Sequence, residues 1–279
     1  MDFVLDRFGF KRYGKEELAQ ALYKNGCKLN ADGVAVCRKC GTPKMWYYDY
    51  TDSWFPIACK HELDEDKREK DDTAIERYRA NSGIEGRLAD ASFNNFGITN
   101  GNREAYSRSL QYAANIEKIM PKGYGVYYYG KSGVGKTYIA ACLGNMLLDM
   151  GIEVKFAKVS DILTDIKEAY SRRGNEAAVL NEYIFADVAI LDDIGSEDYT
   201  AKRGAAVSFA QEKLFQIIDG RYSRKKPTIF TSNYSLEELI TKRGILRKTV
   251  ERIMEMSTRK FEITGESFRI TKQTEIEEF

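Results

Sequence analysis

The stretch GYGVYYYGKSGVGKT, residues 123–137, decides the fold class of this chain. It contains the pattern G-x-x-x-x-G-K-[ST] between an apolar, strand-like run and the helix-like run TYIAACLGNMLL. Glycines let the backbone curl so that successive N–H groups point at phosphate oxygens, and the helix N-terminus adds the positive end of its dipole. The stretch predicts a phosphate-binding loop. The alternative is a chance match in a glycine-rich turn, against which the strand–loop–helix context argues.

The residues of this loop predict ATP and Mg²⁺ as cofactors. Lys136 is expected to reach the β- and γ-phosphates, and Thr137 is expected to place its hydroxyl on Mg²⁺. The residues expected to line the nucleotide are Gly130, Ser132, Gly133, Val134, Gly135, Lys136, Thr137 and Tyr138.

Outward from the loop, the chain alternates between strand-like and helix-like segments from about residue 90. Such alternation predicts an α/β fold with a largely parallel sheet and helices on both faces. The strand-like runs are residues 126–129, 154–157, 188–191, 228–231 and 261–264.

Two of these runs end in polar side chains that suit phosphate chemistry. VAILDD, residues 188–193, is a buried-strand pattern ending in Asp192, expected to hold Mg²⁺, and Asp193, expected to orient and deprotonate the attacking water. The run at 228–231 leads to Asn233, expected to contact the γ-phosphate or that water. The alternatives are an ordinary strand-end turn for the aspartates and a helix N-cap for Asn233, although Ser235 fits the cap better.

A cysteine cluster near the N-terminus predicts a structural zinc site. Cys37 and Cys40 form a C-x₂-C pair, and Cys59 and His61 follow after eighteen residues that suit a two-stranded hairpin. Four protein ligands would leave no open coordination position, so this zinc would be structural. The alternative is free thiols in a small core. Cys27 is left out because its spacing fits no second pair.

Composition and charge bound the remaining possibilities. The chain has 279 residues, 43% apolar and 30% charged, and a formal net charge of +1, so any basic patch must be local. The cysteine cluster near the N-terminus favours the cytoplasm, where such clusters indicate metal sites before disulfides. No apolar run approaches the roughly 18 residues of a membrane span, and the N-terminus is charged throughout, which argues against a secretory signal. The mixed-charge run at 62–82 predicts a solvated helix that acts as a linker.

These stretches together resemble the AAA+ ATPases, and within them the helicase loaders of the DnaC/DnaI type, which are close to the IstB transposition helpers. The resemblance covers roughly residues 88–272. It is carried by ASFNNF at 91–96, the phosphate loop, LDDIG at 191–195, IIDGRY at 217–222, PTIFTSN at 227–233 and VERIMEMSTRKFEITGESFR at 250–269.

The resemblance assigns roles to two arginines. It implies that Arg252 is an arginine finger, which enters the nucleotide site of the adjacent subunit, and that Arg269 is the sensor-2 arginine of its own subunit. The alternative for Arg252 is an exposed helix arginine, and Arg243, Arg247 and Lys248 are close enough to keep the finger assignment open. Where most AAA+ enzymes have Asp-Glu, this chain has Asp192-Asp193, which implies weak, assembly-dependent hydrolysis.

The segment after the second strand resembles the helical insertion with which initiators and loaders hold single-stranded DNA. Tyr170 offers an aromatic face for base stacking, and Arg172 and Arg173 offer cations for phosphates. The alternative is a surface helix end whose arginines complement the helix dipole.

The resemblance implies an ATP-dependent loader of a DnaB-type replicative helicase onto single-stranded DNA, in a bacterial cell. Residues 1–61 would form a helicase-binding zinc module, residues 62–87 a charged helical linker, and residues 88–279 a three-layer AAA+ ATPase domain that self-associates into a ring or spiral. Two alternatives stay open: an IstB-like transposase helper that assembles on duplex DNA, and a zinc-bearing DNA-binding adaptor with a non-catalytic ATP site.

Overall fold

The computed structural model describes residues 27–29, 35–38, 45–48, 53–56, 72–171, 174–197, 199 and 207–268. The chain divides into two compact units, Met1–Thr73 and Ala74–Phe279.

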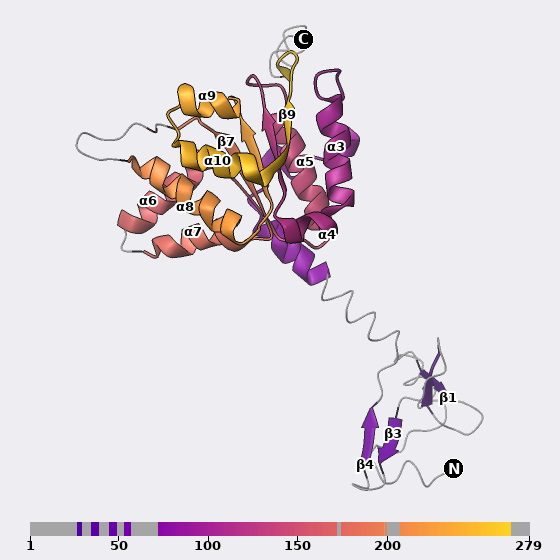
Figure 1. The fold of residues 1–279 in the computed structure, drawn as a ribbon. Helices are drawn as coiled ribbons and strands as arrows, with labels where there is room; N and C mark the ends of the chain where they lie inside the picture. Colours follow the sequence, from indigo (N-terminus) through magenta and orange to yellow (C-terminus); the bar gives the residue numbers. More distant parts are fainter. Residues whose placement is uncertain are drawn as a thin grey trace, which may run out of the picture. The chain divides into compact units, whose positions relative to one another are not determined.

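The described part of the first unit consists of two antiparallel strand pairs (Figure 1). Strand β1 (Cys27–Leu29) pairs with β2 (Ala35–Cys37), and β3 (Met45–Tyr48) pairs with β4 (Ser53–Pro56). The second pair confirms the hairpin predicted between the two halves of the cysteine cluster. Its strands are rich in aromatic residues, which favour extended backbone.

The second unit alternates helices with strands, as the sequence predicts. A helix over residues 72–80, most of it in this unit, confirms the predicted charged helix over that part of its length, and it is mostly exposed. In chain order, the elements that follow are η2 (Gly86–Leu88), η3 (Phe93–Asn95), α3 (Arg103–Ala114), α4 (Ile116–Ile119), η4 (Met120–Lys122), β5 (Gly125–Tyr129), α5 (Lys136–Asp149), β6 (Val154–Lys158), α6 (Val159–Ser171), α7 (Glu176–Phe185), β7 (Val188–Ile194), α8 (Phe209–Ser223), β8 (Thr228–Ser232), α9 (Leu236–Thr241), α10 (Arg247–Met256) and β9 (Ser257–Glu262).

The strands form one parallel five-stranded sheet in the order β6-β7-β8-β5-β9. Helices α3 and α5 cover one face, and α6, α8 and α10 cover the other (Figure 1). This arrangement confirms the predicted α/β three-layer architecture. Because all strands are parallel, their carboxyl ends meet at one edge of the sheet, where such folds bind their ligands.

The core is two apolar clusters separated by the sheet. Alternating side chains of β5 enter opposite clusters, so Tyr127 packs with α6 and α8 while Tyr128 packs with α3 and α5. Both tyrosines are fully buried, and their hydroxyls bond to the Tyr234 carbonyl at 2.7 Å and to Ser109. A buried hydroxyl without a partner would cost free energy, so these bonds make the tyrosines compatible with the core.

The amino ends of β7 and β8 are tied together by Arg221 of α8, which is fully buried. Its guanidinium donates to the Thr228 hydroxyl at 2.8 Å and to the carbonyls of Ala186 and Pro227, at 3.0 and 2.6 Å. Burial lowers the pKa of this guanidinium. We refer to Arg221 and these acceptors as the Arg221 clamp.

The strand predicted at 261–264 is observed at Ser257–Glu262, so it begins four residues earlier and ends two residues earlier than predicted. This strand lies at the edge of the sheet, and Thr258, Arg259 and Lys260 are exposed, so it lacks the apolar run that marks the central strands. Within the described ranges, none of the helices combines the length and apolar character that crossing a membrane requires.

Candidate functional site

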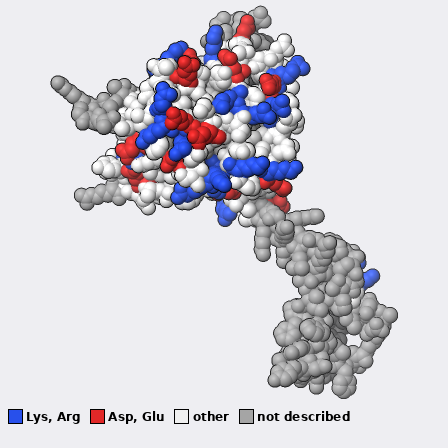
Figure 2. All heavy atoms as spheres, viewed as in Figure 1, with Lys and Arg blue, Asp and Glu red and all other residues white. Residues whose placement is uncertain are grey.

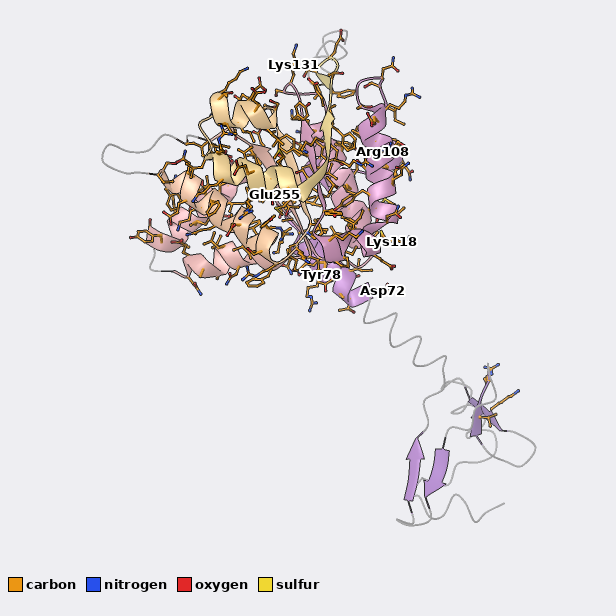
Figure 3. The ribbon with its side chains drawn as sticks, viewed as in Figure 1. Asp72, Tyr78, Arg108, Lys118, Lys131 and Glu255 are labelled. Atoms are coloured by element: carbon orange, nitrogen blue, oxygen red, sulfur yellow. The ribbon has the colours of Figure 1, made fainter. Side chains whose placement is uncertain are left out.

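The phosphate loop, residues 130–135, connects β5 to α5 at the carboxyl edge of the sheet. Figure 3 labels Lys131 of this loop, near the end of β9. Gly133 has a φ of +86°, and a Cβ there would meet the Ser267 hydroxyl oxygen at 2.0 Å. Only glycine fits such a position without displacing its neighbour. The local geometry therefore agrees with the predicted loop at the N-terminus of a helix.

The segment after β9 lies along this loop. The N–H of Ile263 donates to the Tyr129 carbonyl at 2.7 Å, and the N–H of Phe268 donates to the Gly133 carbonyl at 3.1 Å. The predicted sensor-2 residue, Arg269, follows directly in sequence but lies outside the described residues. Its assigned role stays a prediction.

Lys136 is buried at the start of α5 and is 6% exposed. Its ammonium donates to the carbonyls of Gly130 and Lys131, at 2.9 and 2.8 Å, and to the Asn233 side-chain oxygen at 2.9 Å. The lysine thus joins the loop to the end of β8. Asn233 faces this site rather than capping a helix, because Ser235 caps α9 as the sequence indicates.

Asp192 ends the regular part of β7 and is 1% exposed. Its Oδ1 accepts hydrogen bonds from the hydroxyls of Thr137, at 2.8 Å, and Thr231, at 2.6 Å. Burial is the largest influence on this carboxyl and raises its pKa, while the two hydroxyls act in the opposite direction. Thr137 and Asp192 are 55 residues apart in sequence, and both are predicted magnesium ligands, so their contact agrees with that prediction.

The side chains of Thr137 and Asp192 fit a magnesium ion. Both offer hard oxygen donors, which Mg²⁺ prefers. The carboxylate is buried against two uncharged hydroxyls, and a buried charge is stabilised when a counter-ion is bound beside it. A hydroxyl that donates its proton to Asp192 keeps its lone pairs available for a cation.

Asp193 adopts a left-handed backbone conformation, with a φ of +58°. Its side chain accepts a hydrogen bond from the Asn233 amide at 3.0 Å, and its N–H donates to the Thr231 hydroxyl at 2.9 Å. Asn233 also accepts a hydrogen bond from Lys136. Its side chain therefore links the carboxylate predicted to activate water to the lysine predicted to bind phosphate. The structure brings Lys136, Thr137, Asp192, Asp193 and Asn233 into one network.

The stretch at 91–96 packs against the helix that follows the loop. The Tyr138 hydroxyl donates to the Asn95 side-chain oxygen at 2.8 Å, and the ring of Tyr138 stacks with Phe96, with centroids 6.1 Å apart. Asn95 was not among the predicted site residues. Its signal in the sequence is the capping-box relation with Ser92, which fixes its side chain.

Two arginines near α10 have different environments. Arg243 donates to the main-chain carbonyls of Gly195 and Glu197, the latter at 2.8 Å, and thus holds the turn after β7. Arg252 is 37% exposed, contacts the carboxylates of Asp219 at 3.3 Å and Glu255 at 3.6 Å, and lies over the Tyr222 ring at 4.1 Å. Figure 3 labels Glu255 on α10.

The predicted DNA-contacting residues are described only in part. Tyr170 near the end of α6 is 76% exposed, as base stacking requires. Arg172 and Arg173 lie outside the described residues. Basic and acidic side chains are interspersed over the face of residues 74–268 that Figure 2 presents, so a broad basic surface does not appear on that face.

The predicted zinc ligands also lie mostly outside the described residues. Cys37 ends β2, and its backbone is described, but Cys40, Cys59 and His61 fall beyond the described ranges. Within those ranges, no three His, Cys, Asp or Glu side chains form a group that could hold a metal ion. The zinc site stays a prediction.

The nucleotide-binding geometry agrees with the family to which the sequence is similar. Residues 55–276 of the chain match the model of the family described as "IstB-like ATP binding protein". The chain belongs to this family. The predicted resemblance is thereby confirmed, and with it the expectation of a nucleotide-binding AAA+ domain.

Two proteins similar in sequence to this chain are named replicative helicase loaders. Replicative helicase loader DnaC of Buchnera aphidicola subsp. Baizongia pistaciae is 30% identical over 164 residues, which are 57% of this chain and 62% of that protein. Replicative helicase loader DnaI of Bacillus subtilis is 27% identical over 186 residues, which are 67% of this chain and 56% of that protein. The matches therefore span less than two thirds of the length of these relatives.

A solved structure shows the same fold. The DnaC helicase loader superposes with a TM-score of 0.56 and 25% identity, over 64% of this chain and 100% of that chain. Over that share of the chain, the fold is thus the same as that of a helicase loader.

Proposed function

We propose that this protein is an ATP-dependent loader of the replicative DNA helicase onto single-stranded DNA. The observation that carries the proposal is the network of Lys136, Asn233 and Asp193 beside the Thr137–Asp192 pair, found in a chain whose relatives are named replicative helicase loaders. The network is suited to bind a triphosphate and to activate water. The names of the relatives point to the task that such a cycle serves.

The site residues divide the work of ATP hydrolysis. Loop N–H groups and Lys136 bind the phosphates, with the ammonium exchanging its carbonyl partners for phosphate oxygens. Thr137 and Asp192 hold Mg²⁺, which when bound neutralises charge on the phosphate oxygens. Asp193 accepts a proton from the attacking water, and Asn233 orients the carboxylate that does so. Hydrolysis is slow because aspartate at 193 is one methylene shorter than the usual glutamate.

Self-association completes the site in this proposal. Arg252 reaches the nucleotide of an adjacent copy, and Arg269 contacts the nucleotide of its own subunit. Two features support Arg252 over Arg243 as the finger. Arg252 is held by partly exposed carboxylates that it can leave, whereas Arg243 is engaged by main-chain carbonyls of its own subunit. ATP then favours the assembled form, and hydrolysis releases it.

The trans role of Arg252 has a direct test. Arg252→Ala and Lys136→Ala variants should each lack turnover, but a mixture of the two should recover part of it. Recovery occurs because some neighbouring pairs combine an intact finger with an intact phosphate loop. Turnover by Arg252→Ala alone at the wild-type rate would contradict the assignment.

The N-terminal residues 1–61 bind the helicase and contain a structural zinc held by Cys37, Cys40, Cys59 and His61. The hairpin β3–β4 supports this proposal, because it lies between the two predicted ligand pairs. Residues 62–87 connect this module to the ATPase domain of residues 88–279. Elemental analysis of freshly purified protein should find zinc, and its absence would defeat this part of the proposal.

Single-stranded DNA binds at the end of α6 through Tyr170, Arg172 and Arg173, in the cytoplasm where the helicase acts. The exposed ring of Tyr170 supports stacking on a base. Tyr170→Ala should weaken binding of single-stranded DNA, whereas Phe185→Ala, which removes another half-exposed aromatic ring, should not. Equal losses in the two variants would contradict the site.

Co-purification with the host DnaB-type helicase tests the loader function. The full chain should capture the helicase, and ATP should change the amount captured in wild type but not in Lys136→Ala. An IstB-like transposase helper would instead bind duplex DNA tightly and ignore the helicase. An adaptor with a non-catalytic site would show no turnover, so ATP hydrolysis lost in Asp193→Asn would exclude it.

A further inference from the structure

Strand β7 contains an irregularity at its two catalytic carboxylates. Leu191 is paired with Phe230 on β8, and the next paired residues are Ile194 and Ser232. Two residues of β7, Asp192 and Asp193, therefore face one residue of β8. Such a bulge re-aims side chains and disrupts the regular ladder.

The single residue that faces the bulge is Thr231, which is 1% exposed. Its hydroxyl donates to Asp192 Oδ1 at 2.6 Å and accepts from the Asp193 N–H at 2.9 Å. A hydroxyl has one proton to donate and lone pairs to accept with, so both bonds form at once. One side chain thus contacts both acidic residues, the first through its carboxylate and the second through its backbone.

The Asp193 backbone needs this support. A non-glycine residue with a φ of +58° occupies a strained region, and such conformations persist only where the surroundings hold them. The bond to Thr231 fixes the N–H of the strained residue, and the Asn233 amide fixes its carboxylate. Other hydroxyls of β8 serve different groups: Thr228 contacts Arg221, and Ser232 donates to the Ile194 carbonyl.

We propose that Thr231 is a positioning residue that sets both carboxylates of the nucleotide site, aligning Asp192 for Mg²⁺ and Asp193 for the attacking water. This inference rests on the proposed use of ATP with Mg²⁺ at the site. The threonine acts through the two aspartates and does not itself contact the reacting atoms. Its loss leaves the phosphate loop intact, so the nucleotide still binds but its response to Mg²⁺ declines.

The test compares Thr231→Val with Thr231→Ser. Valine keeps the shape of threonine and removes the hydroxyl, whereas serine keeps the hydroxyl. Calorimetry with a non-hydrolysable ATP analogue measures affinity with Mg²⁺ and with EDTA. In EDTA, Thr231→Val should bind the analogue with wild-type affinity. The increase in affinity that Mg²⁺ causes should be about tenfold smaller than in wild type, as expected for a lost hydrogen bond to a charged group. Thr231→Ser should restore most of that gain.

Thr249→Val is the matched control. Thr249 is also 1% exposed, and among the described residues its hydroxyl has no hydrogen-bond partner. The same chemical change there should leave Mg²⁺-dependent affinity and turnover at wild-type values. Where Thr231→Val fails to fold, Thr231→Ala against Thr231→Ser isolates the hydroxyl, because both lack the methyl group.

The outcome is decided by the hydroxyl. Wild-type Mg²⁺ dependence in Thr231→Val, or no advantage of serine over alanine, would overturn the proposal. A wild-type chain that binds the analogue with Mg²⁺ but never hydrolyses ATP would defeat the proposed catalytic function separately. The Mg²⁺ response would still report on Thr231.

Discussion

The two ends of the parallel sheet each contain a buried cation, and the two cations differ in what surrounds them. At the amino end, Arg221 bonds to carbonyls that precede β7 and β8 and to the Thr228 hydroxyl. At the carboxyl end, Lys136 bonds to two carbonyls of a glycine-rich loop and to Asn233, which is shared with Asp193. The partners of Arg221 belong to the framework, whereas those of Lys136 belong to a site that a phosphate can enter.

Burial of a charged side chain therefore does not by itself indicate function. Arg221 is the more completely buried of the two, at 0% exposure against 6% for Lys136. What separates them is whether the surroundings offer an alternative partner. The N-terminus of α5 can bind an anion, and a phosphate bound there would give the Lys136 ammonium an acceptor in place of its present carbonyls.

The largest expected effect follows from removal of the Arg221 clamp. Arg221→Ala leaves several buried carbonyls without donors and should lower the free energy of unfolding by about 3–5 kcal/mol. Urea unfolding measures the loss. The exposed neighbour Arg224, changed to alanine, should cost less than about 1 kcal/mol. A stable Arg221→Ala protein with impaired nucleotide binding would reverse the assigned roles of the two ends.

Lys136→Ala should give the opposite profile. Affinity for ATP with Mg²⁺ should fall about 100-fold, which is ~2.7 kcal/mol, because the phosphates lose a buried cation. The free energy of unfolding should change by less than about 1.5 kcal/mol, since Gly130, Lys131 and Asn233, which accept its hydrogen bonds, are all partly or fully exposed. Calorimetry and urea unfolding measure the two quantities, with Lys118→Ala on α4 as the control that removes an exposed charge outside the loop.

Asp193→Asn should separate chemistry from binding. The amide cannot accept the proton of the attacking water, so kcat should fall about 100-fold while the affinity for ATP stays within about threefold. Single-turnover kinetics measure the first quantity. Arg259→Gln, at an exposed position of β9, controls for a charge change on the same domain. Unchanged turnover in Asp193→Asn would remove Asp193 from the proposed chemistry.

The smallest effect distinguishes the two arginines near α10. Arg243→Ala should destabilise the chain by about 1.5–3 kcal/mol, since it removes charged hydrogen bonds to the turn after β7. Arg252→Ala should cost less than about 1 kcal/mol, because its ion pairs are partly exposed. Thermal and urea unfolding compare the two variants. Equal losses would contradict the view that Arg252 is available to an adjacent copy.

The sequence predicts the site at the carboxyl end of the sheet better than it predicts the rest of the fold. The spacing of glycines and the lysine in the loop is imposed by phosphate geometry, and the Asp192–Asp193 pair follows an unmistakably apolar strand, so local patterns suffice. Asn233 is predictable because Ser235 is the better cap. Thr231 was missed because a threonine within a strand usually serves β-structure, although its position two residues before Asn233 places it on the same side of the strand.

Features that depend on strand order could not be read from the sequence. The edge position of β9 explains its polar residues, but that position is known only from the sheet order. The Arg221 clamp likewise depends on Ala186 before β7, which is 35 residues from Arg221 in sequence, although Pro227 is only 6 residues away. The IIDGRY stretch contains Arg221, but the sequence does not indicate which groups accept its hydrogen bonds.

The most direct measurement is a crystal structure of the full chain with a non-hydrolysable ATP analogue and Mg²⁺. We expect the triphosphate to lie on residues 130–137, with the Lys136 ammonium moved from the Gly130 and Lys131 carbonyls to phosphate oxygens, and with Thr137 and Asp192 at the metal. The Arg221 contacts should be unchanged. This expectation would be contradicted by a nucleotide bound elsewhere, or by a Lys136 that stays bonded to the two carbonyls beside a bound triphosphate.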